Sequence, residues 1–193
     1  MSLIDTLQQQ LSGPVLDQIG HSLGTDRAKA STAVAAALPV LLGALGRNAA
    51  DPRGADALHQ AIARDHDGGL LDSLGPFLQA PESGAGAGIL KHLLGARQPR
   101  VESGLGQAVG LDQNQMGKLL MTLAPIVLAA LGKAQRKDGL DASALSSILG
   151  AERQKVETQG PAGLLGALLD SDGNGDVDLA DIARKGLGGL FGR

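Results

Sequence analysis

The sequence predicts an all-α fold, a multihelical bundle, on three observations. The apolar residues are mainly Leu and Ala, and the 193 residues include only two aromatic side chains, Phe77 and Phe191. Strands favour aromatic and β-branched residues, so this composition favours helices. The 29 glycines and 8 prolines predict many helices with frequent ends. The third observation is an internal repeat.

Segment 16–66 is echoed by segment 102–153 at an offset of about 86 residues. The recurring residues are mainly glycine, aspartate and proline, at positions where helices end, begin or bend. The pairs are Gly20 and Gly106, Gly24 and Gly110, Asp26 and Asp112, Pro39 and Pro125, Leu45 and Leu131, and Gly46 and Gly132. We therefore predict a bundle built from a duplicated helical unit.

Each unit is expected to begin with a short helix that ends at a glycine. These helices are predicted over Val15–Leu23 and Val101–Val109, because the following glycine adopts the left-handed conformation at low cost. Asp26 and Asp112 are then placed to cap the next helix, and Gln115 completes a capping-box pattern with Asp112.

A long apolar helix follows in each unit and should lie at the centre of the fold. The most apolar stretches, 33–46 and 119–132, each have 14 residues, which is short of the roughly 20 needed to span a bilayer. Apolar residues of the second stretch cover nearly the whole circumference, as in a helix buried on all sides. The central Pro39 and Pro125 should kink each helix or split it in two.

A third helix closes each unit, and three shorter segments connect the two units. The closing helices are predicted over Pro52–Arg64 after an Asp51 cap and Ala142–Leu149 after an Asp141 cap. The connecting segments are Leu70–Leu78, a flexible loop over 80–88, and a helix over Ile89–Gly95.

The repeat, three sequence segments and the acidic stretch before a terminal Leu-Phe resemble the bacterial YidB-like family, a domain of unknown function. The segments are GILKHLLG, GLDQNQMGKLLMTLAPIVLAALGK and GLDASALSSILG. The resemblance extends from about Leu3 to Phe191. It implies a compact helical fold and, for many members, an Asp- and Gly-rich C-terminal loop. It implies no activity, substrate or catalytic residue.

The C-terminal stretch DSDGNGDVDLAD matches the twelve-residue calcium loop of EF-hand proteins. Its oxygen-bearing residues occupy positions 1, 3, 5, 7, 9 and 12, and this spacing wraps the chain around a hard cation that takes six to eight oxygen ligands. The predicted calcium ligands are Asp170, Asp172, Asn174, Asp176, Asp178 and Asp181.

Other positions of this loop also fit, with one departure from the EF-hand pattern. Gly175 stands where the chain turns sharply, and Val177 is an apolar anchor. Asp181 replaces the usual Glu and is too short for easy bidentate binding, as in dockerin modules, which this stretch also resembles. We expect weak affinity or competition from Mg²⁺. Because the chain has one such loop, a structural ion is favoured over a sensor; the alternative is an acidic turn without metal.

Two further motifs resemble catalytic or metal-binding sites, and a structural role is the favoured interpretation of each. The segment GHSLG, residues 20–24, matches the nucleophile elbow of hydrolases, but a helical pattern precedes it where a strand is required. The cluster Asp65, His66 and Asp67 could serve acid–base chemistry or a second cation, and a solvated turn is favoured.

These patterns predict a helical domain over 1–159 and a calcium-binding segment over 160–193. We expect a non-enzymatic calcium-binding protein, with membrane association or an enzyme of unknown type as alternatives. A net charge of −3 disfavours nucleic acid, and the absence of cysteine excludes thiolate chemistry. The first ten residues lack a signal-peptide pattern, so the expected location is cytoplasmic. The sequence does not identify a protein partner.

Overall fold

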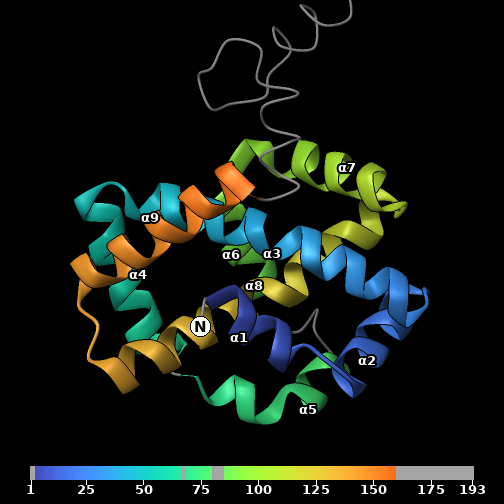
Figure 1. Cartoon of the computed structure of the whole chain (residues 1–193), viewed down its shortest axis with the longest axis horizontal. Helices are drawn as coiled ribbons and strands as arrows, with labels where there is room; N and C mark the ends of the chain where they lie inside the picture. Colours follow the sequence, from blue (N-terminus) through green and yellow to red (C-terminus); the bar gives the residue numbers. More distant parts are fainter. Residues whose placement is uncertain (1–2, 67, 80–84, 160–193) are drawn as a thin grey trace, which may run out of the picture. The chain divides into compact units, whose positions relative to one another are not determined.

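The computed structural model describes residues 3–66, 68–79 and 85–159, and within these the chain is helical without strands, which confirms the all-α prediction (Figure 1). The chain divides into two units, Met1–Arg153 and Gln154–Arg193. Nearly all of the described residues belong to the first unit, and the last described helix crosses the boundary between the two.

The described elements are short helices around two long ones. In chain order they are α1 (Leu3–Gln10), α2 (Pro14–Leu23), α3 (Arg27–Ala49), α4 (Pro52–Asp65), the 3₁₀ helix η1 (Gly69–Ser73), α5 (Leu74–Gln79), α6 (Gly86–Leu94), the 3₁₀ helix η3 (Gly95–Arg97), α7 (Gln98–Val109), α8 (Gln113–Asp138) and α9 (Ala142–Gln159).

Helices α3 and α8 pack against each other, and the shorter helices surround them, as Figure 1 shows. In α8, every residue from Leu119 to Gly132 except Met121 is buried, as the all-round apolar pattern predicted. Helix α3 has exposed side chains in its N-terminal half, such as Ala28, Ser31 and Ala35, whereas no residue from Ala36 to Gly46 is exposed. The two central helices therefore share one core, and α8 is more fully buried in it than α3.

Both central helices run through their prolines without interruption. Pro39 lies inside α3 and Pro125 inside α8, and each helix is a single element. Of the two outcomes predicted for the prolines, the split is wrong, and the kink stays a prediction. A proline removes one backbone hydrogen bond but packs as an apolar side chain, and both prolines are buried in the core.

The α2–α3 and α7–α8 junctions have the same backbone conformation. Gly24 ends α2 with φ 67° and ψ 34°, and Gly110 ends α7 with φ 71° and ψ 34°. Asp26 accepts a hydrogen bond from the Lys29 N–H at 2.8 Å, and Asp112 accepts one from the Gln115 N–H at 2.8 Å. The predicted glycine ends and aspartate caps are confirmed.

The capping box at α8 is also confirmed, and it reaches a neighbouring helix. The Asp112 N–H donates to Oε1 of Gln115 at 3.0 Å, while Nε2 of Gln115 donates to the Leu23 carbonyl at 2.7 Å. The Gln115 side chain thus provides a hydrogen-bond partner for a backbone N–H at the start of α8 and for a backbone carbonyl at the end of α2.

The third helix of each segment contacts the central helix of the other segment at a glycine: α9 contacts α3, and the end of α4 contacts α8. A Cβ at Gly46 of α3 would lie 3.0 Å from the carbonyl oxygen of Leu149 in α9, and a Cβ at Gly132 of α8 would overlap the carbonyl oxygen of His66 after α4. Backbone therefore packs closely against backbone at both crossings, and the approach at Gly132 leaves no room for a Cβ.

Side-chain hydrogen bonds fasten the same third helices. The Ser146 hydroxyl of α9 donates to the Ala49 carbonyl at 2.7 Å, and Nε2 of His59 in α4 lies 3.2 Å from the Leu140 carbonyl before α9. Each bond joins residues more than 80 positions apart.

Several predicted boundaries change, and α7 begins at Gln98 rather than at Val101. The loop predicted over 80–88 is partly helical, because Gly86 begins α6 and is buried; residues 80–84 lie outside the described residues. Helix α9 continues past Gly150, which does not adopt positive φ. The segment Leu70–Leu78 is divided between η1 and α5.

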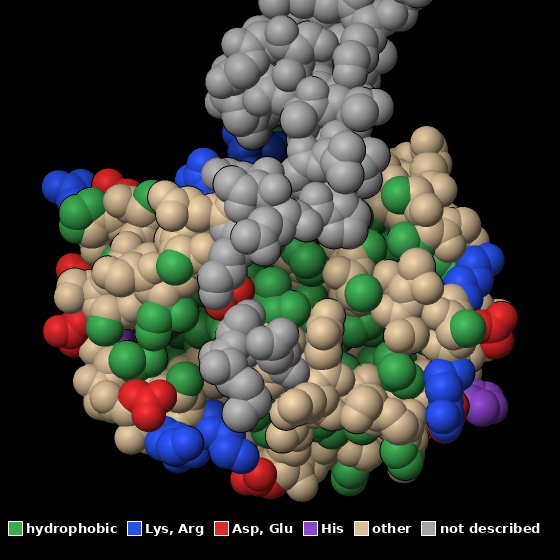
Figure 2. Space-filling view, in the orientation of Figure 1, with side chains coloured by type: hydrophobic (Ala, Val, Ile, Leu, Met, Phe, Trp, Pro, Cys, Tyr) green, Lys and Arg blue, Asp and Glu red, His purple; other side chains and the backbone are tan. Residues whose placement is uncertain are grey.

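Helices α3 and α8 are both long and apolar enough to cross a membrane by length and composition, with 56% and 83% of their most apolar 18-residue windows buried in the protein. On the face drawn in Figure 2, most charged side chains lie near the rim, and hydrophobic side chains are visible nearer the centre. Half-buried hydrophobic residues such as Ile4, Val40 and Leu58 pack against the core.

Candidate functional site

The predicted calcium loop lies outside the described residues. Its ligands, Asp170, Asp172, Asn174, Asp176, Asp178 and Asp181, all follow Gln159, where the description of the chain ends. The loop thus stays a prediction from the sequence. The residues from Leu3 to Gln159 can be tested for other sites.

Within the described part of the chain, no group of three or more His, Cys, Asp or Glu side chains lies close enough to hold a metal ion. The aspartates predicted as helix caps each accept a backbone hydrogen bond at the start of a helix; these are Asp26, Asp51, Asp112 and Asp141. For example, Asp141 accepts hydrogen bonds from the Ala144 N–H and the Ser143 hydroxyl, and these bonds hold the pKa of its carboxyl below the ordinary value.

The GHSLG segment forms the last turn of α2 and the glycine that follows. The Ser22 hydroxyl donates to the Ile19 carbonyl at 2.9 Å, and Nδ1 of His21 lies 2.8 Å from the Asp17 carbonyl. Both polar groups are bonded to carbonyls of their own helix. A nucleophile elbow needs a strand before the serine, and a helix stands in its place.

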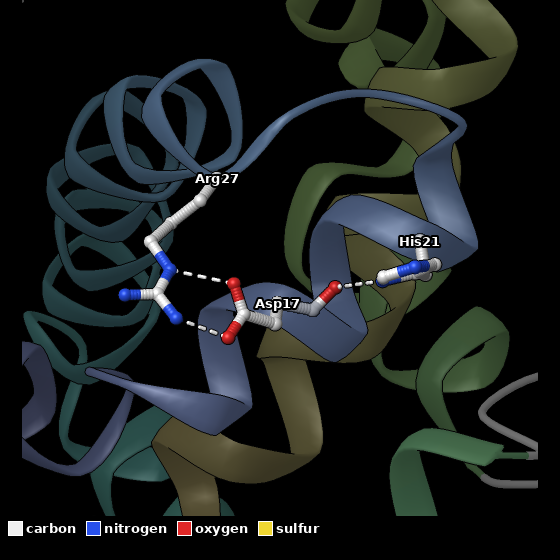
Figure 3. Close-up of polar contacts among 3 residues, drawn as sticks. All are labelled: Asp17, His21 and Arg27. Atoms are coloured by element: carbon white, nitrogen blue, oxygen red, sulfur yellow. Dashed lines mark hydrogen bonds and ion pairs between the residues drawn. The ribbon is translucent and has the colours of Figure 1, made fainter.

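Asp17 and Arg27 form a two-pronged ion pair that joins α2 to the first turn of α3 (Figure 3). The hydrogen bond from the guanidinium lowers the pKa of the Asp17 carboxyl and raises the pKa of Arg27. Both side chains are accessible to water. The pair therefore joins the two helices at the protein surface.

Asp65 and His66 end helix α4 and have separate roles. The Arg64 guanidinium donates to both carboxylate oxygens of Asp65, at 3.0 and 2.7 Å, which lowers the pKa of Asp65. Burial lowers the pKa of His66, and the Asp65 carboxylate opposes this effect. Asp67, the third member of the predicted cluster, lies outside the described residues.

The sequence patterns did not reveal a buried carboxylate, Glu102 of α7, which is 9% exposed. Gln98 donates to one carboxylate oxygen at 2.7 Å, and Gln113 donates to the other at 3.5 Å. Gly117 of α8 leaves room for the group, because a Cβ there would lie 3.2 Å from Oε1 of Glu102.

A signal for this residue was present in the sequence. Glu102 shares a helix face with Leu105 and Gly106, at spacings of three and four residues, and both are buried. A carboxylate on a buried face needs hydrogen-bond donors, and two glutamine amides supply them. The cluster locks α7 onto the start of α8, which is a structural role.

The described residues define a helical protein whose polar clusters fasten helices to one another. The chain belongs to the family described as Bacterial protein of unknown function (DUF937), which matches residues 5–134. The matched region runs from α1 into α8 and ends before the acidic loop. Comparison with curated proteins and with solved structures finds no match.

Proposed function

We propose that the chain is a non-enzymatic calcium-binding protein whose ion is held by the loop from Asp170 to Asp181. The proposal rests on the spacing of six oxygen-bearing residues around a glycine at the sixth position. Five of the six are aspartates, and without a cation their carboxylates would repel one another.

The number of sites expected is one. Since the described residues contain no group that could hold a metal, specific binding should depend on the loop alone. Asp in place of Glu at position 12 weakens bidentate coordination, so Mg²⁺ should compete with Ca²⁺.

A structural role for the ion is supported by the presence of one loop of this kind in the sequence. The buried hydrophobic residues of the described part run from Leu7 to Leu149. The ion is proposed to order the C-terminal segment, as a single loop without a paired second loop would.

Isothermal titration calorimetry of the whole chain with Ca²⁺ tests this proposal. We expect one site, lost in Asp170→Asn combined with Asp172→Asn. The matched control is Asp56→Asn, an exposed aspartate of α4, which should bind as the parent does. No heat from the parent chain, or equal binding by the loop variant, would contradict the proposal.

We also propose that the bundle arose from a duplicated unit, segments 16–66 and 102–153, in a YidB-like domain. The identical glycine ends and aspartate caps of the α2–α3 and α7–α8 junctions support this. So do the crossings at Gly46 and Gly132, where each central helix meets the third helix of the other segment.

Membrane association is a second candidate, supported by the length and hydropathy of α3 and α8. Their burial in the described fold requires that the bundle open before either helix could enter a bilayer. Liposome flotation tests it: protein that stays at the bottom of the gradient with both neutral and anionic vesicles would remove this candidate.

A further inference from the structure

We draw no further inference here: the strongest candidate, the exposed face of small side chains on α3 formed by Ala28, Ser31, Thr32 and Ala35, carries nothing because the described part of the structure does not show what covers it.

Discussion

Helices α3 and α8 follow the same plan, yet their surroundings differ. Both begin at an aspartate cap, contain a buried proline and cross another helix at a glycine. Helix α8 is buried from Leu119 to Gly132 except at Met121, and a buried glutamate ties α7 to its start. Helix α3 keeps an exposed face, and a water-accessible ion pair ties α2 to its start. The two junctions thus share their backbone conformation and differ in the burial of the polar side chains that join their helices.

The two glycine crossings should differ most in their tolerance of a methyl group. Gly132→Ala should destabilise the protein by about 3 kcal/mol, because its Cβ would overlap a backbone carbonyl that cannot move away. Gly46→Ala should cost about 1 kcal/mol, since its nearest contact is 3.0 Å. Urea unfolding followed by circular dichroism measures both.

Gly43→Ala is the matched control for these variants. Gly43 lies in α3, and a Cβ added there would have no atom within 4 Å, so the better helix propensity of alanine should stabilise the protein by up to about 1 kcal/mol. If Gly132→Ala proved as stable as Gly43→Ala, the close crossing of α8 with the end of α4 would be incorrect.

Removing the polar side chain that joins the helices at each junction should change stability by different amounts. Glu102→Ala should cost about 1 to 3 kcal/mol, because it leaves the amide of Gln98 without its buried acceptor. Asp17→Ala, at an exposed pair, should leave the urea midpoint at pH 7 nearly unchanged. Equal losses of stability in the two variants would show that burial does not determine how much each interaction contributes.

The two aspartate caps should contribute similarly, with a small excess at α8. Asp26→Ala should cost about 1 kcal/mol. Asp112→Ala should cost slightly more, because Gln115 loses one half of its capping box. Thermal melts of both variants, with Asp56→Ala as an exposed control, would reveal whether the order is reversed.

The smallest expected effect is the acid response of the exposed ion pair. Arg27 lowers the folded-state pKa of Asp17, so the stabilisation is complete above the ordinary pKa of 3.8 and is lost as pH falls through the lowered value. Carboxyl NMR titration should show the Asp17 pKa rising toward its ordinary value in Arg27→Gln. An unchanged titration would mean that the pair does not form in solution.

Local sequence signals predicted much of this fold. Gly24, Gly110 and the aspartate caps act through their own backbone, so their structure follows from neighbouring residues. The enclosed position of α8 followed from its apolar periodicity.

Features set by distant contacts could not be predicted in this way. Gly86 lies at the start of α6 close to the Met121 carbonyl of α8, where an added Cβ would overlap the carbonyl oxygen. Helix α9 passes through Gly150, since a glycine signals a helix end only when its backbone turns left-handed. The donors for Glu102 come partly from α8, and their proximity depends on packing.

A crystal of the whole chain grown with calcium tests the central proposal most directly. We predict one anomalous peak within the loop, surrounded by oxygen atoms of Asp170, Asp172 and Asp181 at about 2.3 to 2.6 Å. A well-ordered loop whose carboxylates face solvent, with no ion despite saturating calcium, would contradict it.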